Sequence, residues 1–422
     1  MEKKSLNIVL FYNNLPSGGV CRVICEICKR LLERGHRLTC YNPEKNATVS
    51  SFLKRYGATV ISHGAPSYFN ALAIRPYFLN PWAAAGIFLK RSLLYDHLCR
   101  QLAHQIDAAS FDVAWIEKCC FVSSTFLLKH LRTTKVYYCQ EPWRDAYEGQ
   151  AHLAGYKLCG VTGKLAAWGE NCKLNLRRII DRKNACSADM ILANSKYSQG
   201  YIAKAYGVSS EVCYLGVDNE FFHPMSLERK NFILSVGRIE KRKRHDLLIE
   251  SLGHMPEKNR PQAVVVASRD SSARRLELEA LAREHGVHLI IKLGISDGEL
   301  VQLYNEATCV FYGAMREPFG LVALEAMACG TPIIAVREGG LQESVVDGKT
   351  GFLVNPEPED CADAIRKIFA DQNLQGKFSE AGIKHVASSW TWDHAATRFE
   401  NYLYDAVNEQ MQKKSNKGIK CK

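Results

Sequence analysis

Two glutamates eight positions apart, Glu317 and Glu325, flank a turn that follows an apolar segment and leads into a helix. Pro318 suits the first turn of a helix, and Gly320 lets a ligand approach the backbone closely. The N–H groups left unpaired at such a helix start, together with the helix dipole, form an anion site suited to a diphosphate. One carboxylate can then contact a ligand at the loop, and the other carboxylate can contact a more distant part of the same ligand. Two glutamates alone are also typical of a solvated helix surface.

Alternating strands and helices position this turn. In the first half, a strand at residues 7–12 leads through a glycine-bearing turn to a helix at 20–34. Further strands are predicted at 37–41, 59–61, 113–116, 136–139 and 190–193. In the second half, strands are predicted at 232–236, 263–267, 289–293, 310–312 and 333–336, with helices at 244–252, 273–285, 297–306, 322–328 and 340–346. Such alternation predicts an α/β fold with two Rossmann-like, doubly wound domains in tandem.

The charge of the 422-residue chain is divided unevenly between its halves. Residues 1–224 hold 28 Lys and Arg against 17 Asp and Glu, whereas residues 225–422 hold 27 of each. The formal net charge of +11 therefore belongs to the first half, so we expect the two domains to have different partners. We place the domains at 1–224 and 225–393, followed by a terminal helix at 394–410 and a disordered basic tail at 411–422.

The composition favours a folded cytoplasmic protein, with 47% apolar and 23% charged residues. The apolar stretch at residues 8–12 is shorter than the roughly 7–15 residues of a signal-peptide core. No apolar run approaches the ~18 residues of a membrane-spanning helix. The sixteen cysteines include no two CxxC motifs at zinc-ribbon spacing, so we expect reduced core residues.

Two stretches interrupt the alternation, at residues 66–98 and 147–178. Both mix aromatic side chains, alanine, leucine and basic residues. Apolar helical segments of this kind can form a membrane-facing or hydrophobic-ligand surface, and they can equally be ordinary helices that pack on the sheet. The sequence leaves both interpretations open.

The string from Glu317 to Pro332 resembles the E-x7-E signature of retaining GT-B glycosyltransferases, specifically the large family four, also named glycosyl transferases group 1. Other motifs follow the family's order. Gly237-Arg238 with Lys243 is similar to its "GR…K" segment, and residues 339–343 and 347–353 resemble its next two loops. The resemblance is dense over about residues 189–400 and thin before them. It implies two Rossmann-like domains that face across a cleft, with the C-terminal helix returning toward the first domain.

The resemblance also implies roles for individual residues. Arg238 and Lys243 would hold the donor diphosphate, which gains negative charge as the sugar departs. Glu325 would accept hydrogen bonds from the nucleotide ribose, and Glu317 would face the transferred sugar. The other expected donor contacts are the backbone of Phe319, Gly320 and Leu321, the base-stacking loop at Gly294 and Ile295, and the glycine loop at Gly18 and Gly19.

The acceptor side departs from the family pattern. Family members often carry a histidine after the fourth or fifth strand of the first domain, where this chain has Gln140. An amide can donate a hydrogen bond to a sugar oxygen but cannot act as a general base, so Glu141 is the nearest candidate for that role. Pro16-Ser17 stand where glycogen and starch synthases carry a lysine, which disfavours a polyglucan synthase. The absence of a DxD-like motif at a strand end fits chemistry without a metal or another cofactor.

The resemblance therefore predicts a retaining, metal-independent hexosyltransferase that moves a sugar from a nucleoside diphosphate to an acceptor hydroxyl by front-face attack. The second domain would bind the donor and the basic first domain the acceptor. The positive charge of the first domain favours an anionic acceptor or an anionic membrane surface. We therefore expect a role in glycolipid, lipid-linked oligosaccharide or cell-surface polysaccharide synthesis. The protein would be cytoplasmic and could associate peripherally with the inner membrane face. The alternatives are a nucleotide-sugar epimerase on the same architecture and a non-catalytic sugar-nucleotide-binding subunit. No nucleic-acid-binding module is indicated.

Overall fold

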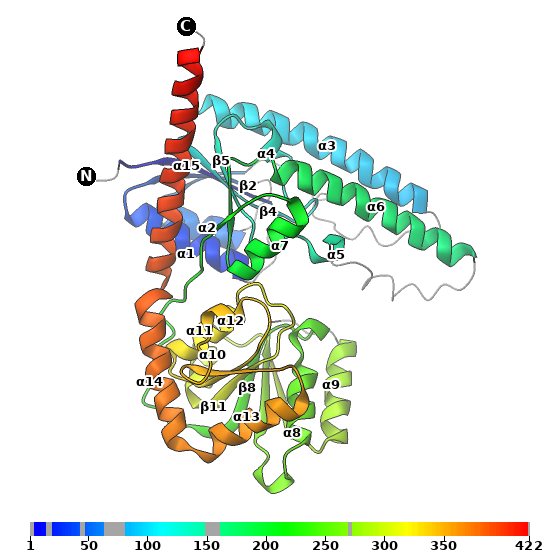
Figure 1. Ribbon diagram of the computed structural model, residues 1–422, viewed down its shortest axis with the longest axis vertical. Coiled ribbons are helices and arrows are strands. Elements are labelled where there is room, and N and C mark those ends of the chain that lie inside the picture. Colours follow the sequence, from blue (N-terminus) through cyan, green and yellow to red (C-terminus); the bar gives the residue numbers. More distant parts are fainter. Residues whose placement is uncertain are drawn as a thin grey trace. The chain divides into compact units, whose positions relative to one another are not determined.

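The computed structural model describes residues 4–13, 19–42, 47–62, 81–147, 161–268 and 272–420. The chain forms an α/β fold of two compact units, each built on a parallel sheet (Figure 1). Unit 1 comprises residues 1–213 and 396–422, and unit 2 comprises residues 214–395. Unit 1 is therefore discontinuous in sequence, because the end of the chain returns to it.

The sheet of unit 1 has the strand order β3-β2-β1-β4-β5-β6-β7, and its described pairings are parallel. The strands are β1 (Asn7–Asn13), β2 (Arg37–Asn42), β3 (Thr59–Ser62), β4 (Val113–Cys119), β5 (Thr134–Tyr138), β6 (Met190–Ala193) and β7 (Glu211–Val212). Ile8 of β1 pairs with Leu38 of β2 on one side and with Val113 of β4 on the other. The strand order reverses between β1 and β4. Open sheets of this kind bind ligands at the carboxyl ends of the strands beside such a reversal, so the end of β4 is a candidate binding position.

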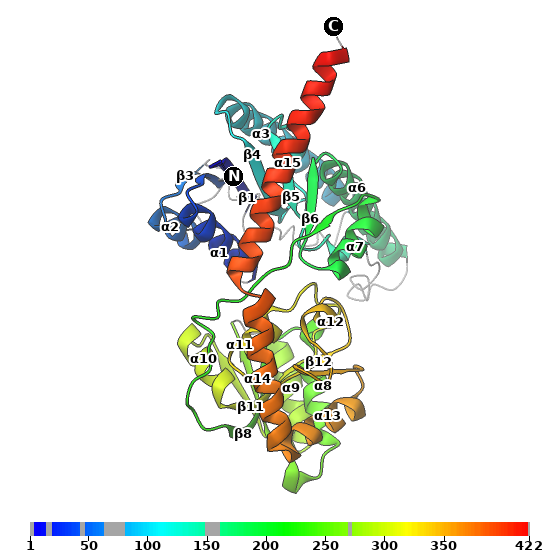
Figure 2. The same ribbon diagram turned by 60° about the vertical axis from the view of Figure 1, so that its left-hand side comes forward.

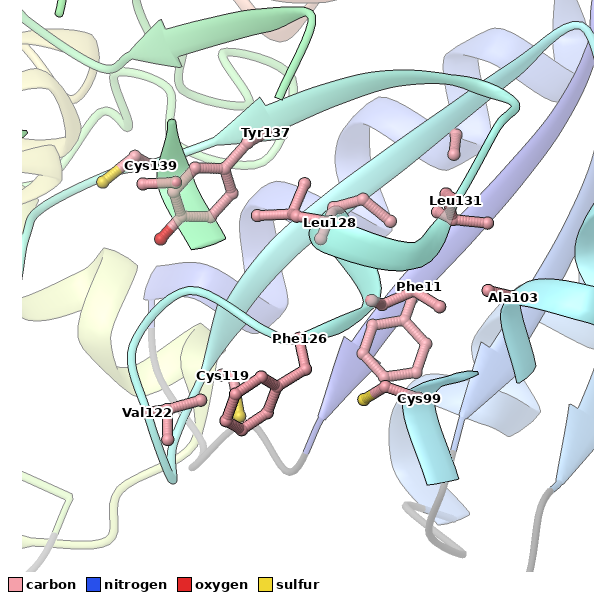
Figure 3. Packing of buried hydrophobic residues seen from close by; sticks show 14 of the residues in the cluster. Phe11, Cys99, Ala103, Cys119, Val122, Phe126, Leu128, Leu131, Tyr137 and Cys139 are labelled. Atoms are coloured by element: carbon pink, nitrogen blue, oxygen red, sulfur yellow. The ribbon is translucent and has the colours of Figure 1, made fainter. Parts of the chain in front are cut away.

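Helices cover both faces of this sheet. They are α1 (Gly19–Glu33), α2 (Ala47–Arg55), α3 (Pro81–Ala108), α4 (Leu127–His130), α5 (Arg144–Tyr147), α6 (Val161–Ala185), α7 (Lys196–Tyr206) and α15 (Trp392–Lys420). On one face, Figure 3 shows Phe11 of β1 beside Cys99 of α3 in a buried cluster. On the other face, α15 runs along the sheet (Figure 2). The ring of its Phe399 lies 4.5 Å from that of Trp115 and 5.7 Å from that of Tyr138.

The sheet of unit 2 has the order β10-β9-β8-β11-β12-β13, again with parallel pairing. Its strands are β8 (Lys230–Val236), β9 (Gln262–Ala267), β10 (Leu289–Leu293), β11 (Ala307–Tyr312), β12 (Ile333–Val336) and β13 (Gly351–Val354). Its α-helices are α8 (His245–Gly253), α9 (Ser272–Glu284), α10 (Asp297–Glu306), α11 (Leu321–Ala328), α12 (Leu341–Ser344), α13 (Pro358–Ala370) and α14 (Gln372–Ser389), with 3-10 turns η3 (Lys241–Lys243) and η4 (Glu257–Asn259). Strands β9, β11 and β12 of this sheet are largely buried, as their almost continuous apolar sequences require.

Several elements differ from the sequence-based expectation. Residues 351–353, expected in a loop, begin strand β13, which pairs with β12. Helix α15 continues to Lys420 and so includes most of the 411–422 tail for which the sequence predicted disorder. An ion pair of 3.5 Å between Glu409 and Lys413, one turn apart, supports the helix there.

The two stretches that interrupt the sequence pattern contribute long helices to unit 1. Residues 66–80 and 148–160 lie outside the described ranges, and most of the rest belongs to α3 and α6. These helices pack against one another and lie side by side (Figure 1). Within the described ranges, no helix is both long and apolar enough to cross a membrane.

Candidate functional site

A charged cluster lies where β11 of unit 2 ends. The Nζ atom of Lys243 lies 2.8 Å from the hydroxyl of Tyr312 and 2.9 Å from Oε2 of Glu317. Burial lowers the pKa of Lys243, but the neighbouring hydroxyl and carboxylate outweigh it and raise this pKa above its usual range. Lys243 therefore stays charged at any physiological pH. The structure thus brings together two of the predicted site residues, Lys243 and Glu317.

The segment between β8 and α8 positions Lys243. A Cβ atom at Gly237 would lie 3.3 Å from Cδ of Lys243, so the glycine leaves room for the lysine side chain. Arg238 follows with its side chain 56% exposed, and its Nη1 lies 3.1 Å from Oε1 of Glu240. The two predicted diphosphate ligands therefore differ: Lys243 is anchored beside Glu317, whereas Arg238 is largely solvated and paired with a local carboxylate.

Two glycines after β12 hold the Glu317 loop in place. The N–H of Gly340 donates a 2.8 Å hydrogen bond to the carbonyl of Glu317. A Cβ atom at Gly339 would lie 2.2 Å from that same oxygen, and one at Gly340 would lie 2.3 Å from the carbonyl oxygen of Pro318. Only glycine allows this approach, so residues 339–340 fix the backbone of the loop that carries Glu317.

Glu338 connects three loops and was not identified from the sequence. Its carboxylate accepts a 2.9 Å hydrogen bond from the guanidinium of Arg244 and another of 2.9 Å from the backbone N–H of Arg316. The N–H of Met315 donates to the carbonyl of Arg242 over 2.8 Å. The only sequence signal for Glu338 is its position directly before Gly339-Gly340.

Helix α11 starts at Gly320, which has a φ of +91°, a conformation that favours glycine. No side chain caps the helix start, so its first N–H groups and the helix dipole are available to an anion. Phe319, directly before the glycine, is 2% exposed, with its ring 5.8 Å from that of Trp390. The predicted contacts at Phe319, Gly320 and Leu321 are therefore backbone groups on a packed scaffold.

Glu325 lies inside α11 and is 5% exposed, so it is not part of a solvated helix surface. Its Oε2 accepts a 2.8 Å hydrogen bond from the hydroxyl of Tyr304 on α10. Tyr304 was not identified from the sequence. A buried carboxylate held by a neighbouring hydroxyl is a suitable partner for a ribose diol.

Two further positions of unit 2 are the predicted base-stacking loop and a buried histidine. Gly294 ends β10 with a φ of +62° and donates its N–H to the carbonyl of Ala267 over 2.9 Å, and Ile295 follows it. His245, the first residue of α8, lies 3.0 Å through Nδ1 from the hydroxyl of Ser235. Burial lowers the pKa of His245 to about 4, so the ring is neutral and braces the chain that carries Arg238.

In unit 1, the predicted residue Gln140 lies two residues after the end of β5 and is 9% exposed. Its amide Nε2 lies 3.4 Å from Oε2 of Glu117, and Nε1 of Trp115 donates to Oε1 of the same carboxyl over 2.9 Å. Glu117 is fully buried, and burial raises its pKa to about 8. Sequence analysis missed Glu117, although a glutamate near the end of an apolar strand at the reversal of strand order is a signal for it.

The other predicted residues of unit 1 are placed as follows. Glu141 forms an ion pair with Arg144 of α5. Gly19 is the first residue of α1, and Gly18 lies outside the described residues. The guanidinium of Arg177 from α6 lies 3.0 Å from the ring centroid of Trp143, and the two form a cation–π pair. Trp143 follows Gln140 by three residues in the sequence.

Comparison with known proteins agrees with the arrangement in unit 2. Residues 217–385 match the family described as glycosyl transferases group 1. The D-inositol 3-phosphate glycosyltransferase of Corynebacterium aurimucosum is 31% identical over 63% of this chain and 68% of its own length. A Rickettsia africae glycosyltransferase structure has a TM-score of 0.70 at 18% identity, covering 96% of this chain and 99% of that one. The Anabaena HepE structure in complex with UDP and glucose has a TM-score of 0.68 at 18% identity, covering 95% of this chain and 100% of that one. The chain belongs to the glycosyl transferases group 1 and has the GT-B fold of two parallel-sheet domains.

Proposed function

We propose that this glycosyltransferase moves a hexosyl group from a nucleoside diphosphate sugar to an acceptor hydroxyl, with retention at the anomeric carbon and without a metal. The observation that carries the proposal is the cluster of Lys243, Tyr312 and Glu317 at the end of β11. A permanent cation beside a carboxylate, with the uncapped start of α11 in the same loop, suits a diphosphate joined to a sugar. The Anabaena structure that shares the fold contains UDP and glucose, which supports this class of donor.

Each group of unit 2 has a separate part in this chemistry. Lys243 and the N–H groups of α11 would stabilise the negative charge that develops on the departing diphosphate. Arg238, exposed beside Glu240, would leave that ion pair and add a second cation. Glu317, ionised beside Lys243, would accept a hydrogen bond from the sugar or stabilise the cationic anomeric centre. Glu325, fixed by Tyr304, would bind the ribose.

The step that accounts for retention needs no side-chain nucleophile. The bond between the anomeric carbon and the diphosphate oxygen breaks, and the acceptor oxygen forms its bond on the same face. The acceptor proton passes to the departing phosphate oxygen. Gln140 cannot take that proton and Glu141 is paired with Arg144, so a phosphate base fits the residues found in unit 1.

For the acceptor we propose an anionic lipid-linked or polysaccharide-precursor hydroxyl compound, bound mainly by unit 1. The charge excess of residues 1–224 supports it. The name of the Corynebacterium relative, which contains inositol 3-phosphate, is consistent with an anionic acceptor. At the end of β5, Gln140 would donate a hydrogen bond to a sugar or acceptor oxygen.

The test is a panel of nucleoside diphosphate sugars, scored by thermal shift and then by proton NMR during turnover. At 100 times its dissociation constant a true donor adds about 2.7 kcal/mol of stability. Slow hydrolysis of that donor should release a sugar whose first-formed anomer matches the donor. Release of the opposite anomer would contradict retention, and conversion of one nucleotide sugar into another would identify an epimerase. A thermal shift without turnover, even with acceptors added, would indicate a non-catalytic binding subunit.

A further inference from the structure

Helices α3 and α6 expose large apolar side chains that the proposed chemistry does not use. On α3, Leu89, Leu93 and Leu94 are 46%, 63% and 46% exposed. On α6, Trp168 and Ile179 are 45% and 64% exposed. These five side chains are a large share of the exposed large apolar residues in the described ranges, and they lie on two helices that pack against one another (Figure 1).

The exposed side chains form stripes on the outer surfaces of the two helices. On α3, Phe88, Tyr95 and Cys99 point into the core of unit 1, and Leu89 and Leu93 lie one turn apart away from that face. On α6, Asp181 is buried, and Trp168 and Ile179 are separated by close to three full turns, which places them along one side.

The charges beside these stripes all have one sign. Among residues of α3 and α6 whose side chains the structure describes, the exposed ones are apolar, neutral polar, histidine or basic, and none is a carboxylate. The exposed cations are Lys90, Arg100, Arg182 and Lys183. The nearest acid of α3, Asp96, lies 2.7 Å through Oδ1 from His130 Nε2 of α4 and 3.8 Å through Oδ2 from Nη2 of Arg100, so Arg100 is partly neutralised. The stripes and these cations together are called the apolar–basic face.

We propose that the apolar–basic face of α3 and α6 docks unit 1 on an anionic lipid bilayer. Helices that lie in the plane of a membrane surface combine an apolar stripe with lysine and arginine beside it, and the cations are attracted to anionic headgroups. Burial in the bilayer surface covers the leucine, isoleucine and tryptophan side chains that water now contacts. Among the side chains of α3 and α6 that the structure describes, no exposed carboxylate is present to repel an anionic surface.

This inference adds a partner to the proposed function, because a bilayer presents lipid-linked acceptors, but it does not depend on turnover. The full-length chain is mixed with phosphatidylcholine vesicles with and without phosphatidylserine, and the bound fraction is measured by co-sedimentation. We expect binding that needs phosphatidylserine and weakens as salt is added. Equal binding to both vesicle types, or no binding to either, would overturn the proposal.

Variants locate the contact. The double variant Leu93→Glu and Ile179→Glu should lower the partition constant by about tenfold or more, because it removes apolar contact and adds repulsion from anionic lipid. Leu276→Glu is the matched control, since Leu276 is 62% exposed on α9 of unit 2 and should leave binding unchanged. An equal loss of vesicle binding in the double variant and in Leu276→Glu would contradict docking through the apolar–basic face.

Two further measurements separate this proposal from other causes. A thermal shift with the best nucleotide sugar should be the same in the double variant and the wild type, which shows that the chain is folded and that donor binding is intact. Light scattering with size-exclusion chromatography tests whether the face instead joins two copies of the chain. A stable dimer that the double variant dissociates, without vesicle binding by the wild type, would assign the face to self-association and overturn the proposal.

Discussion

The two units share a strand order over six strands, yet the carboxylates near their strand ends have different partners. In unit 2, the carboxylates near the strand ends have cationic or hydroxyl donors: Lys243 for Glu317, Arg244 for Glu338 and Tyr304 for Glu325. In unit 1, the donors described for Glu117 are the neutral groups of Trp115 and Gln140. Glu317 and Glu338 of unit 2 thus lie beside cations, whereas burial without a cation raises the pKa of Glu117 in unit 1.

The difference follows from burial and from the charge of the partner. A carboxyl group taken fully out of water without a cation favours its neutral form, which is the case of Glu117. A lysine beside a carboxylate and a hydroxyl favours its charged form, which is the case of Lys243. Two sheets with the same order over six strands thus hold one buried carboxyl group without a cation and another beside a lysine.

The largest effect is expected from Glu117→Gln. In the folded protein Glu117 keeps its proton until the pH approaches about 8, whereas in the unfolded chain it loses the proton near 4.5. The free energy of unfolding therefore falls as the pH rises through that window, by about 1.4 kcal/mol per pH unit. Glutamine does not titrate, so the variant should match the wild type near pH 5 and become more stable than it toward pH 8. Thermal unfolding across this range measures the difference.

Glu141→Gln is the control for that experiment, because Glu141 lies shortly after the neighbouring strand β5 and is paired with Arg144. Removing its charge should give no gain in stability at high pH. A difference in melting temperature between the wild type and Glu117→Gln that stays constant from pH 5 to pH 8 would show that Glu117 is ionised in the folded protein. The contrast between the two units would then fail.

A second large effect is expected in unit 2 from Lys243→Ala. Loss of one preorganised cation at a departing phosphate costs on the order of 10²–10³ in rate. We expect kcat/KM for the identified donor to fall by that factor, with the fold retained. Arg242→Ala is the matched control, since Arg242 is 51% exposed, is 3.8 Å from Glu240 and should keep near-wild-type activity. Similar rates in both variants would remove Lys243 from the proposed mechanism.

A smaller effect tests the backbone support of the Glu317 loop. Gly339→Ala and Gly348→Ala both place alanine at positive φ, +62° and +71°. Only at Gly339 does the new Cβ meet an obstacle, the carbonyl oxygen of Glu317 at 2.2 Å, whereas nothing lies within 4 Å at Gly348. Overpacking costs roughly 1–3 kcal/mol, so Gly339→Ala should be less stable than Gly348→Ala by about that amount. Denaturant unfolding measures the stability of both variants. Equal losses of stability would mean that the Glu317 loop shifts to accommodate the new Cβ at no cost.

The smallest effect is expected from Tyr304→Phe. The change removes the hydroxyl that donates to Glu325 while keeping the buried ring. Loss of such a hydrogen bond costs about 1–3 kcal/mol, and part of it should appear as weaker donor binding if Glu325 holds the ribose. Isothermal titration calorimetry with the nucleoside diphosphate measures the binding affinity of the variant and the wild type. Tyr402→Phe, which removes a hydroxyl bonded to the carbonyl of Val212 in unit 1, is the control and should leave this affinity unchanged.

Much of both sheets could be predicted from the sequence, because apolar runs separated by short loops are a local signal. The strands beginning at residues 7, 37, 190, 289 and 333 start where the sequence predicted. Strand β13 was missed because its four residues coincide with a turn-like motif, and its stability comes from pairing with β12. Helices α13 and α14 were missed as well, although α13 has Pro358 at its start, a signal that could have found it.

The candidate site was predictable only in part, for a different reason. Lys243 and Glu317 were found because they belong to ordered motifs that resemble a family. Glu117 and Gln140 belong to neighbouring strands separated by a long stretch of sequence, and their contact depends on the strand order. The burial of Glu325 and its Tyr304 partner likewise follows from how α10 and α11 pack. Such pairs have no local signature.

The return of the chain to unit 1 has a consequence for biosynthesis. The aromatic ring of Phe399 covers Trp115 and Tyr138, and Glu400 bridges Arg34 and His36. These contacts form only after residues 396–422 have left the ribosome, although most of unit 1 is synthesised first. A segment made after unit 2 therefore covers a core made before it, and a nascent chain arrested after residue 395 would present an uncovered apolar surface to chaperones.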